Sequence, residues 1–164
     1  MKNKTINISL TAVFAAIYSI SVISLSSISF QLIQVRVADA LLPLSIIFGW
    51  PAIIGVTLGC LIANFFGGLG VVDVVGGSFA NFIATLIAWK IGRRKFKGSW
   101  FSASILETLI VSSIVGFYLS FIFNVPLYIS LLSVLTGSLI AINLIGYLLL
   151  KAISKLAAKY ITSV

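Results

Sequence analysis

Long apolar runs, separated only by short polar breaks, fill almost the whole sequence. The chain has 164 residues, of which 60% are hydrophobic and only 3 are acidic. A water-soluble domain could not bury so much apolar surface, whereas a bilayer core about 30 Å thick requires roughly 20 apolar residues for each helix. The length therefore leaves room for about six membrane-spanning helices and for no separate soluble domain.

Turn signals divide the sequence into an all-α bundle of six predicted transmembrane helices. The chain is polar over Ser26–Arg36, a turn is expected at Trp50–Pro51, and breaks fall at Gly67–Gly70 and Asn124–Pro126. The second predicted helix is short for a span, so we expect neighbouring helices to shield it. The predicted helices are about Thr5–Leu25, Val37–Gly49, Pro51–Phe66, Val72–Ile91, Trp100–Phe123 and Leu127–Leu150.

The basic residues indicate the orientation of this bundle. Six helices would place both termini and the loop between the fourth and fifth helices on one side, and these places hold ten of the eleven Lys and Arg residues. The exception is Arg36. By the positive-inside rule this side is cytoplasmic. We therefore expect a single transmembrane domain over residues 1–164, in the cell membrane, with both termini cytoplasmic. No basic stripe with interleaved aromatics indicates a nucleic-acid partner.

Unusual polar residues gather at the opposite, extracellular ends of the predicted helices. Ionisable groups at membrane depth are expensive and usually face a cavity or a partner, so their convergence predicts a binding pocket open to the outside. The residues at the three outer turns are Gln31, Gln34, Arg36 and Asp39, then Asn64 and Asp73, then Asn124 and Tyr128.

Purely structural interpretations of the charged residues are also open. Arg36 and Asp39 stand three positions apart and could neutralise each other in a salt bridge. Asp73 could act as the amino-terminal cap of the fourth helix, a role that is compatible with ligand binding. Glu107 stands about five residues into the fifth helix from the cytoplasmic side, where it could pair with the basic loop and lie outside any pocket.

Small residues recur at four-residue spacing on several helices. Such ridges let membrane helices approach closely, so they predict internal packing of the bundle. On the first helix, Ala12 and Ala16 could serve the same end or could dock another membrane protein. The ridges are Gly55, Gly59 and Ala63, then Gly76, Ala80, Ala84 and Ala88, then Ser133, Gly137 and Ala141.

Catalytic motifs are missing from the sequence. It contains no phosphate-binding loop, no histidine, no G-x-S-x-G elbow, no H-E-x-x-H helix and no pair of carboxylates close in sequence. We therefore expect no enzyme, no metal site and no cofactor, and we interpret the chain as a binder or a transporter.

Three segments carry a family resemblance. They are Gln34–Leu41 (QVRVADAL), Gly59–Asn64 (GCLIAN) and Gly67–Ser78 (GGLGVVDVVGGS). With these motifs in this order, the chain resembles the queuosine-precursor transporter (QueT) family, the substrate-binding S components of energy-coupling-factor (ECF) transporters. The resemblance is best from about Gln31 to Arg94.

The resemblance implies a six-helix S-component fold with a pocket near the outer face that is closed by the outer loops. The implied substrate is a 7-deazaguanine base, and the resemblance favours 7-aminomethyl-7-deazaguanine among these bases. The implied partners are a transmembrane coupling protein and two cytoplasmic ATPases, whose ATP-driven movement would tilt the loaded protein in the membrane. The A-x-x-x-A pattern of Ala12 and Ala16 would contact the coupling protein.

The implied ligand also fits the residue types of the predicted site. A guanine-like edge offers adjacent N–H donors to a carboxylate and a carbonyl to Arg or an amide, while the aminomethyl cation suits a second acid or an aromatic face. Asp39, where the family usually has glutamate, and Asp73 would fill the two acid roles in either order, and Tyr128 would stack on the base. Near Glu107 the family usually has asparagine. The predicted substrate-binding residues are Gln34, Arg36, Asp39, Asn64, Asp73, Asn81, Glu107 and Tyr128.

Two alternative functions stay open at this point. A stand-alone secondary carrier for a small polar or cationic solute would transport without ATPase partners, and inverted repeats would support it. A non-transporting membrane scaffold subunit would bind no ligand, because its buried polar groups would serve only to fix the register of the helices.

Overall fold

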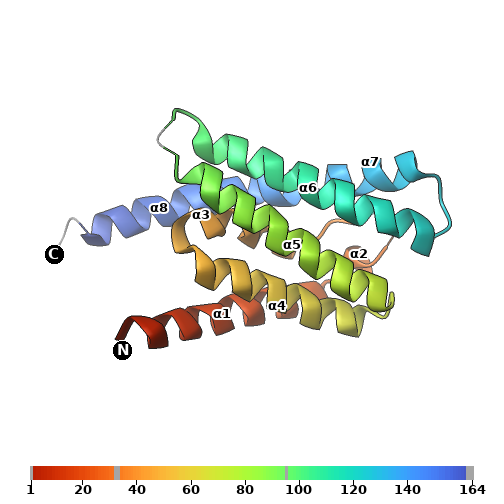
Figure 1. Cartoon of the computed structure of the whole chain (residues 1–164), viewed down its shortest axis with the longest axis horizontal. Coiled ribbons are helices and arrows are strands. Elements are labelled where there is room, and N and C mark those ends of the chain that lie inside the picture. Colours follow the sequence, from red (N-terminus) through yellow and green to blue (C-terminus); the bar gives the residue numbers. More distant parts are fainter. Residues whose placement is uncertain (1, 32–33, 95, 162–164) are drawn as a thin grey trace.

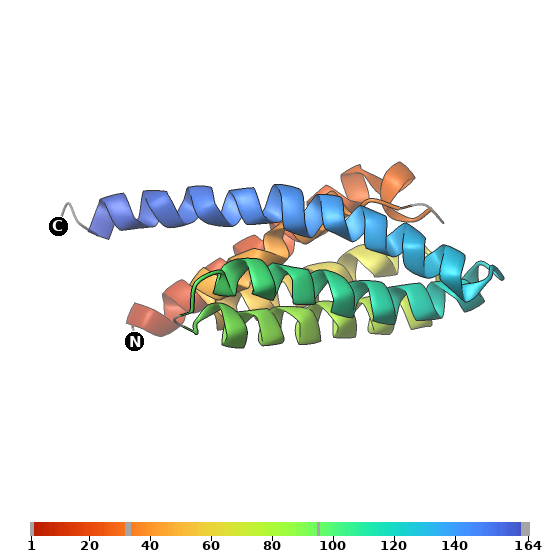
Figure 2. The same ribbon diagram turned by 90° about the horizontal axis from the view of Figure 1, so that it is seen from above.

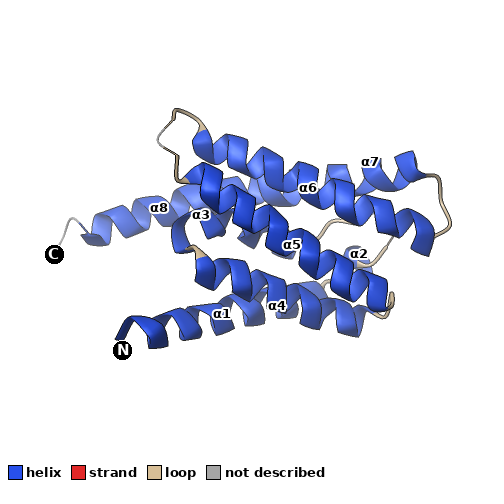
Figure 3. Ribbon diagram, viewed as in Figure 1, coloured by secondary structure: helices blue, strands red, loops and turns tan. Residues whose placement is uncertain are grey.

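The computed structural model describes residues 2–31, 34–94 and 96–161, and it is all-helical over these ranges (Figure 3). The prediction of an all-α bundle is therefore confirmed. The elements are α1 (Lys2–Ser24), α2 (Ser26–Ser29), the 3-10 helix η1 (Val37–Leu44), α3 (Ser45–Phe48), α4 (Trp50–Gly67), α5 (Val71–Gly92), α6 (Ser99–Ile122), α7 (Leu127–Ser138), the π-helical segment η2 (Leu139–Gly146) and α8 (Tyr147–Ile161).

Both termini and the α5–α6 connection lie at one end of the bundle, and the α4–α5 and α6–α7 connections lie at the other (Figure 1). We call the first the basic end. Helices α7, η2 and α8 run on as one continuous helix, and α8 projects beyond the rest of the bundle there (Figure 2). The exposed cations of the basic end are Lys4, Lys90, Arg93, Arg94, Lys97, Lys151 and Lys155. Which side of the membrane this end meets stays a prediction.

Among the described residues, five helical segments are long and apolar enough to cross a membrane, and they match five of the six predicted helices. Large apolar side chains such as Ile8, Phe65 and Phe121 point outward from the bundle. An outer surface of this kind suits lipid, so the chain is a multi-pass membrane protein. The five segments are Lys4–Ser24, Trp50–Gly67, Val71–Gly92, Ser99–Ile122 and Leu127–Leu156.

The second predicted helix forms as Val37–Phe48, a shorter apolar segment of a different kind. Eight of its residues are 3-10 helix and four are α-helix, which together span roughly 22 Å. Leu42 and Ser45 within it are fully buried, so the prediction that neighbours shield this segment is confirmed. That it counts as a sixth membrane span stays a prediction.

The small-residue ridges pack the helices against one another, as predicted. A Cβ on Gly55 or Gly59 would stand 2.8 Å from the carbonyl oxygen of Thr11 or Ala15, respectively, so α4 and α1 are in backbone contact. Gly137 on α7 likewise lies against the backbone of Gln34, which leads into η1. The close contact between Gly137 and Gln34 determines the position of the segment before η1 inside the bundle.

Candidate functional site

A small pocket lies between the segment that leads into η1 and helices α5, α6 and α7. Its volume is about 10 Å³, which is room for about one water molecule. It brings together four of the predicted site residues, because Gln34, Arg36, Asp39 and Asn81 all line it. The remaining lining residues are Val111, Val115, Val134, Gly137 and Ser138.

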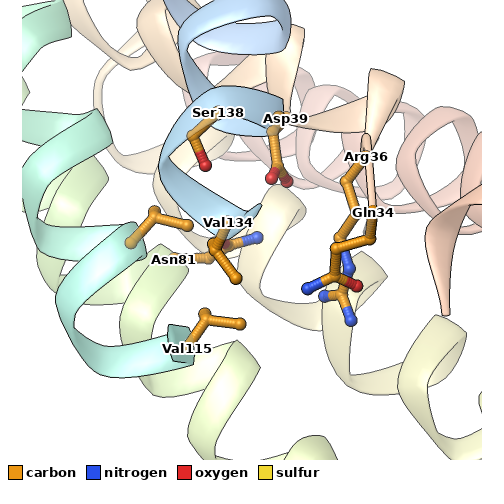
Figure 4. Close-up of a pocket in the computed structure, with 9 residues that line it drawn as sticks. Gln34, Arg36, Asp39, Asn81, Val115, Val134 and Ser138 are labelled. Carbon is orange, nitrogen blue, oxygen red and sulfur yellow. The ribbon is translucent and has the colours of Figure 1, made fainter. Parts of the chain in front are cut away.

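The pocket has a polar side and an apolar side (Figure 4). Gln34, Arg36 and Asp39 come from the segment around the start of η1, and they lie across from Val115 of α6 and Val134 of α7. The polar segment can come this close to α7 because Gly137 has no side chain. The arrangement suits a flat ligand whose faces are apolar and whose edge is polar.

Arg36 is held inside the bundle by contacts in several directions. Its side chain reaches the Ser29 carbonyl oxygen at 3.4 Å, the Cys60 sulfur at 3.8 Å and one carboxylate oxygen of Asp73 at 3.5 Å. The guanidinium also lies over the Phe30 ring, 5.4 Å from its centroid. With 7% of its surface exposed, Arg36 is a buried cation whose countercharge within the described residues is Asp73.

Asp73 stands in the first turn of α5, but it does not cap that helix. Gly70 occupies the cap position and no side-chain cap bond forms, so the interpretation of Asp73 as a cap is wrong. The Tyr118 hydroxyl donates to Asp73 Oδ1 at 2.8 Å, and the Asn64 amide donates to the Asp73 backbone carbonyl at 2.8 Å. Asp73 and Asn64 therefore form the support behind Arg36 and do not line the pocket itself.

Asp39 pairs with a tyrosine rather than with Arg36. The Tyr18 hydroxyl donates to Asp39 Oδ1 at 2.6 Å, and the Asn81 amide donates in turn to the Tyr18 oxygen at 2.9 Å. The ion pair found in the described part of the chain joins Arg36 to Asp73, so the alternative in which Arg36 and Asp39 form a salt bridge is wrong. Asp39 lines the pocket and makes no salt bridge to Arg36, so its carboxylate can still accept hydrogen bonds from a ligand there.

Sequence reasoning missed both tyrosines of this network. Tyrosines of membrane helices collect at the interfaces, and one placed at mid-helix needs a partner for its hydroxyl group. Tyr18 is fully buried in the later part of α1, so its position in an apolar run could have indicated a buried hydrogen-bond partner. Tyr118 lies nearer the end of α6, where position alone gives no such indication.

Several buried oxygen atoms around the pocket have no hydrogen-bond partner among the described residues. They include Gln34 Oε1, Asn64 Oδ1 and Asp73 Oδ2. Each is an acceptor, and a buried acceptor left without a donor costs about 1–3 kcal/mol. Of these atoms, Gln34 Oε1 belongs to a residue that lines the pocket, so it offers an acceptor to an N–H group of a ligand.

Neither Glu107 nor Tyr128 lines the pocket. Glu107 is fully buried and neither carboxyl oxygen has a partner among the described residues, so its predicted pairing with the basic loop is wrong. It stands one helical turn from Val111 on α6, on the same face. Tyr128 is 65% exposed beside Leu132 in a shallow groove on α7, so the structure does not bring it to the pocket.

The two alanines predicted to contact a partner lie on the outer surface of α1. Ala12 and Ala16 are both exposed. Ala12 also lines an open apolar groove between α1 and α4, together with Trp50 and Leu58. The α1–α4 contact is made by the neighbouring face of α1, which leaves these alanines outside the packing of the bundle.

The fold and the pocket define a class: a multi-pass helical membrane protein with a small, polar binding site enclosed by its helices. Residues 8–155 match the QueT transporter family, and the chain belongs to this family. The predicted resemblance is thereby confirmed. The family is one of transporters, which agrees with the interpretation of the chain as a transporter rather than an enzyme.

One curated relative is the queuosine precursor transporter QueT of Lactococcus lactis subsp. cremoris (strain MG1363). It is 38% identical to the chain over 93 residues, which are 56% of this chain and 52% of the relative. The chain therefore spans about half the length of this relative. No solved structure matches the chain.

Proposed function

We propose that the chain is the substrate-binding S component of an ECF-type importer that takes up a queuosine precursor, and that its main substrate is 7-aminomethyl-7-deazaguanine. The observation that carries this proposal is the pocket itself, where a buried Arg36 and a separately held Asp39 face an apolar wall. Membership of the QueT transporter family and the name of the Lactococcus relative support it.

The base would be recognised along its polar edge. A guanine-like edge presents two adjacent N–H donors, and the Asp39 carboxylate can accept both. Arg36 can donate to the ring carbonyl, while Gln34 Oε1 is a further acceptor. Val111 and Val115 would lie against the face of the ring. In this scheme Asp39 contacts the substrate, and Asp73 holds Arg36 in place.

Binding would require one wall of the pocket to move, because a volume of about 10 Å³ is far below the several hundred Å³ of ordinary small-molecule sites. The helical walls are held by continuous backbone hydrogen bonds. The polar wall, Gln34–Asp39, begins as extended chain and is tied to α2 by the bond from Val35 N to Ile28 O. We expect this wall to move outward when the base enters, because it has the fewest backbone bonds to break.

The proposed partners are a transmembrane coupling protein and two cytoplasmic ATPases. The sequence has no phosphate-binding loop, so ATP hydrolysis would come from the partner ATPases. Ala12 and Ala16 present a smooth, exposed stripe on α1, and small residues allow another membrane helix to pack closely. In this arrangement the basic end faces the cytoplasm of the cell, where positive loops are retained.

The proposal is tested by thermal unfolding of the purified protein in lipid nanodiscs with a panel of ligands. The panel comprises 7-aminomethyl-7-deazaguanine, 7-cyano-7-deazaguanine, queuine, guanine, riboflavin, thiamine and biotin. A ligand at a hundred times its dissociation constant adds about 2.7 kcal/mol of stability, which gives a clear shift. We expect a shift with the deazaguanines alone. A folded sample that responds to none of them would refute the proposed substrate class.

A second experiment separates the S component from a stand-alone carrier. Uptake of labelled 7-aminomethyl-7-deazaguanine is measured in proteoliposomes that contain the chain alone or the chain with the coupling protein and ATPases. We expect uptake only in the complete assembly and only with ATP. Uptake by the chain alone would establish the carrier instead.

A further inference from the structure

A second group of buried polar residues lies deeper in the bundle than the pocket. Both carboxyl oxygens of Glu107 on α6 are buried and have no partner among the described residues. The next residue, Thr108, accepts a hydrogen bond at 2.9 Å from the Asn143 amide, and the Asn143 carbonyl oxygen is itself buried without a partner. The three unpaired acceptor atoms therefore belong to Asn143 and to the neighbour of Thr108 in the sequence, and the Thr108–Asn143 bond brings these residues of α6 and η2 to the same level of the bundle.

This second group adjoins the pocket. Glu107 stands four residues before the pocket-lining Val111, which is roughly 6 Å along the same face of α6. A separation of one helical turn is short enough for one small ligand to reach both the pocket and Glu107.

The packing of η2 against η1 places Asn143 at the same level. Gly137 lies against the backbone of Gln34, and Gly146 lies against the backbone of Ala40. Asn143 falls between these two contacts along η2, and its side chain is hydrogen-bonded to Thr108 of α6. It belongs to a π-helical segment, a geometry that is uncommon and occurs frequently at functional sites.

The charges in the interior leave Glu107 without a countercharge. Arg36 is paired with Asp73, and every other lysine or arginine for which the structure describes the burial is exposed. Ionising a buried carboxyl group that has no partner costs several kcal/mol, and a ligand that brings a positive charge would supply the missing countercharge. An ammonium group has three N–H donors, which matches the two Glu107 oxygens and the Asn143 carbonyl oxygen.

We infer that Glu107, with Asn143 and Thr108, forms a deeper subsite for a short cationic arm of the ligand. The inference rests on the proposed function, and it assigns the parts of the ligand: Asp39 takes the edge of the base, and Glu107 takes the ammonium group. The subsite selects a deazaguanine with a primary amine at position 7 over one with a neutral group there.

The test measures the affinities of three ligands for the protein in nanodiscs: 7-aminomethyl-7-deazaguanine, 7-cyano-7-deazaguanine and guanine. A charge-assisted hydrogen bond contributes enough for a change of roughly tenfold or more. We expect Glu107→Gln to lower the affinity for the aminomethyl compound by that factor and to leave the other two within about threefold. Asn143→Ala should give the same pattern with a smaller loss, and it carries the test if Glu107→Gln does not fold.

The matched control is Ser104→Ala on the same helix, whose hydroxyl bonds to the Phe101 carbonyl at 2.9 Å and which does not line the pocket. It should change none of the affinities. Equal losses for all three ligands in the Glu107 and Asn143 variants, or no loss in either, would overturn the subsite. A wild-type protein that binds deazaguanines but does not prefer the amine would overturn the subsite alone. A wild-type protein that binds none would overturn the proposed function as well.

Discussion

Replacing Asp73 by asparagine removes the countercharge of the buried Arg36 guanidinium and changes little else. The amide can still accept from the Tyr118 hydroxyl, and the Asn64 bond goes to the backbone of residue 73. At 3.5 Å and an effective dielectric constant of about 20, the Arg36–Asp73 attraction amounts to roughly 5 kcal/mol before desolvation is subtracted. Removing one partner of a buried pair typically costs about 3–5 kcal/mol.

We expect the lower end of that range, about 3 kcal/mol, because 3.5 Å is longer than an ideal charged hydrogen bond. The measurement is the free energy of unfolding of the ligand-free protein in mixed micelles, titrated with SDS. The double variant Arg36→Gln with Asp73→Asn should recover at least about 1 kcal/mol, since no lone charge is then buried. Tyr118→Phe, which removes only a hydroxyl group, should cost about 1 kcal/mol. A loss below about 1 kcal/mol for Asp73→Asn, or a double variant as unstable as the sum of its parts, would refute this account of the pair.

Three further outcomes follow from the same contacts. Gly137→Val should destabilise the protein by about 1–3 kcal/mol in thermal unfolding, because the new side chain meets the backbone of Gln34. It should also weaken deazaguanine binding in titration calorimetry, and unchanged binding would show that this contact does not shape the pocket. Tyr18→Phe should lower the free energy of unfolding by about 1–3 kcal/mol in the same assay, since Asp39 loses its hydrogen-bond donor. Tyr128→Phe on the exposed surface should change it by no more than about 0.5 kcal/mol. Similar effects of the two substitutions would contradict the proposed hydrogen-bond network. Ala12→Trp should abolish co-purification with the coupling protein and leave ligand-induced stabilisation intact; retained co-purification would remove this face of α1 from the interface.

Most of the fold could be predicted from the sequence because a lipid bilayer imposes a simple rule. Each span needs about 20 apolar residues, and turns fall where glycine, proline or charge interrupts them. The structure places α5 at Val71–Gly92 and α6 at Ser99–Ile122, each within one residue of the prediction. The 3-10 geometry of Val37–Leu44 and the π-helix of Leu139–Gly146 were not predicted, because they depend on how these segments pack against each other.

The site was predicted in its residues but not in its pairings. Gln34, Arg36 and Asp39 were recognised as polar groups out of place in a membrane, Asn81 was predicted from the chemistry of the implied ligand, and all four line the pocket. Their partners could not be found in the same way. Asp39 meets a tyrosine 21 positions away in the sequence, and only the packing of α1 against the start of η1 creates that contact. The three-residue spacing suggested that Arg36 and Asp39 form a salt bridge, whereas in the folded chain Arg36 pairs with Asp73.

All three acids of the chain are buried, whereas the cations of the basic end are exposed. The surface of the described residues therefore carries charge of one sign, concentrated at one end of the molecule. In the proposed orientation an anionic inner leaflet attracts that end by about 1 kcal/mol for each lysine or arginine at its surface. Any reorientation that lifts the basic end away from the headgroups works against this attraction. In the proposed mechanism, the lipid composition of the inner leaflet would therefore set part of the free energy of the transport step.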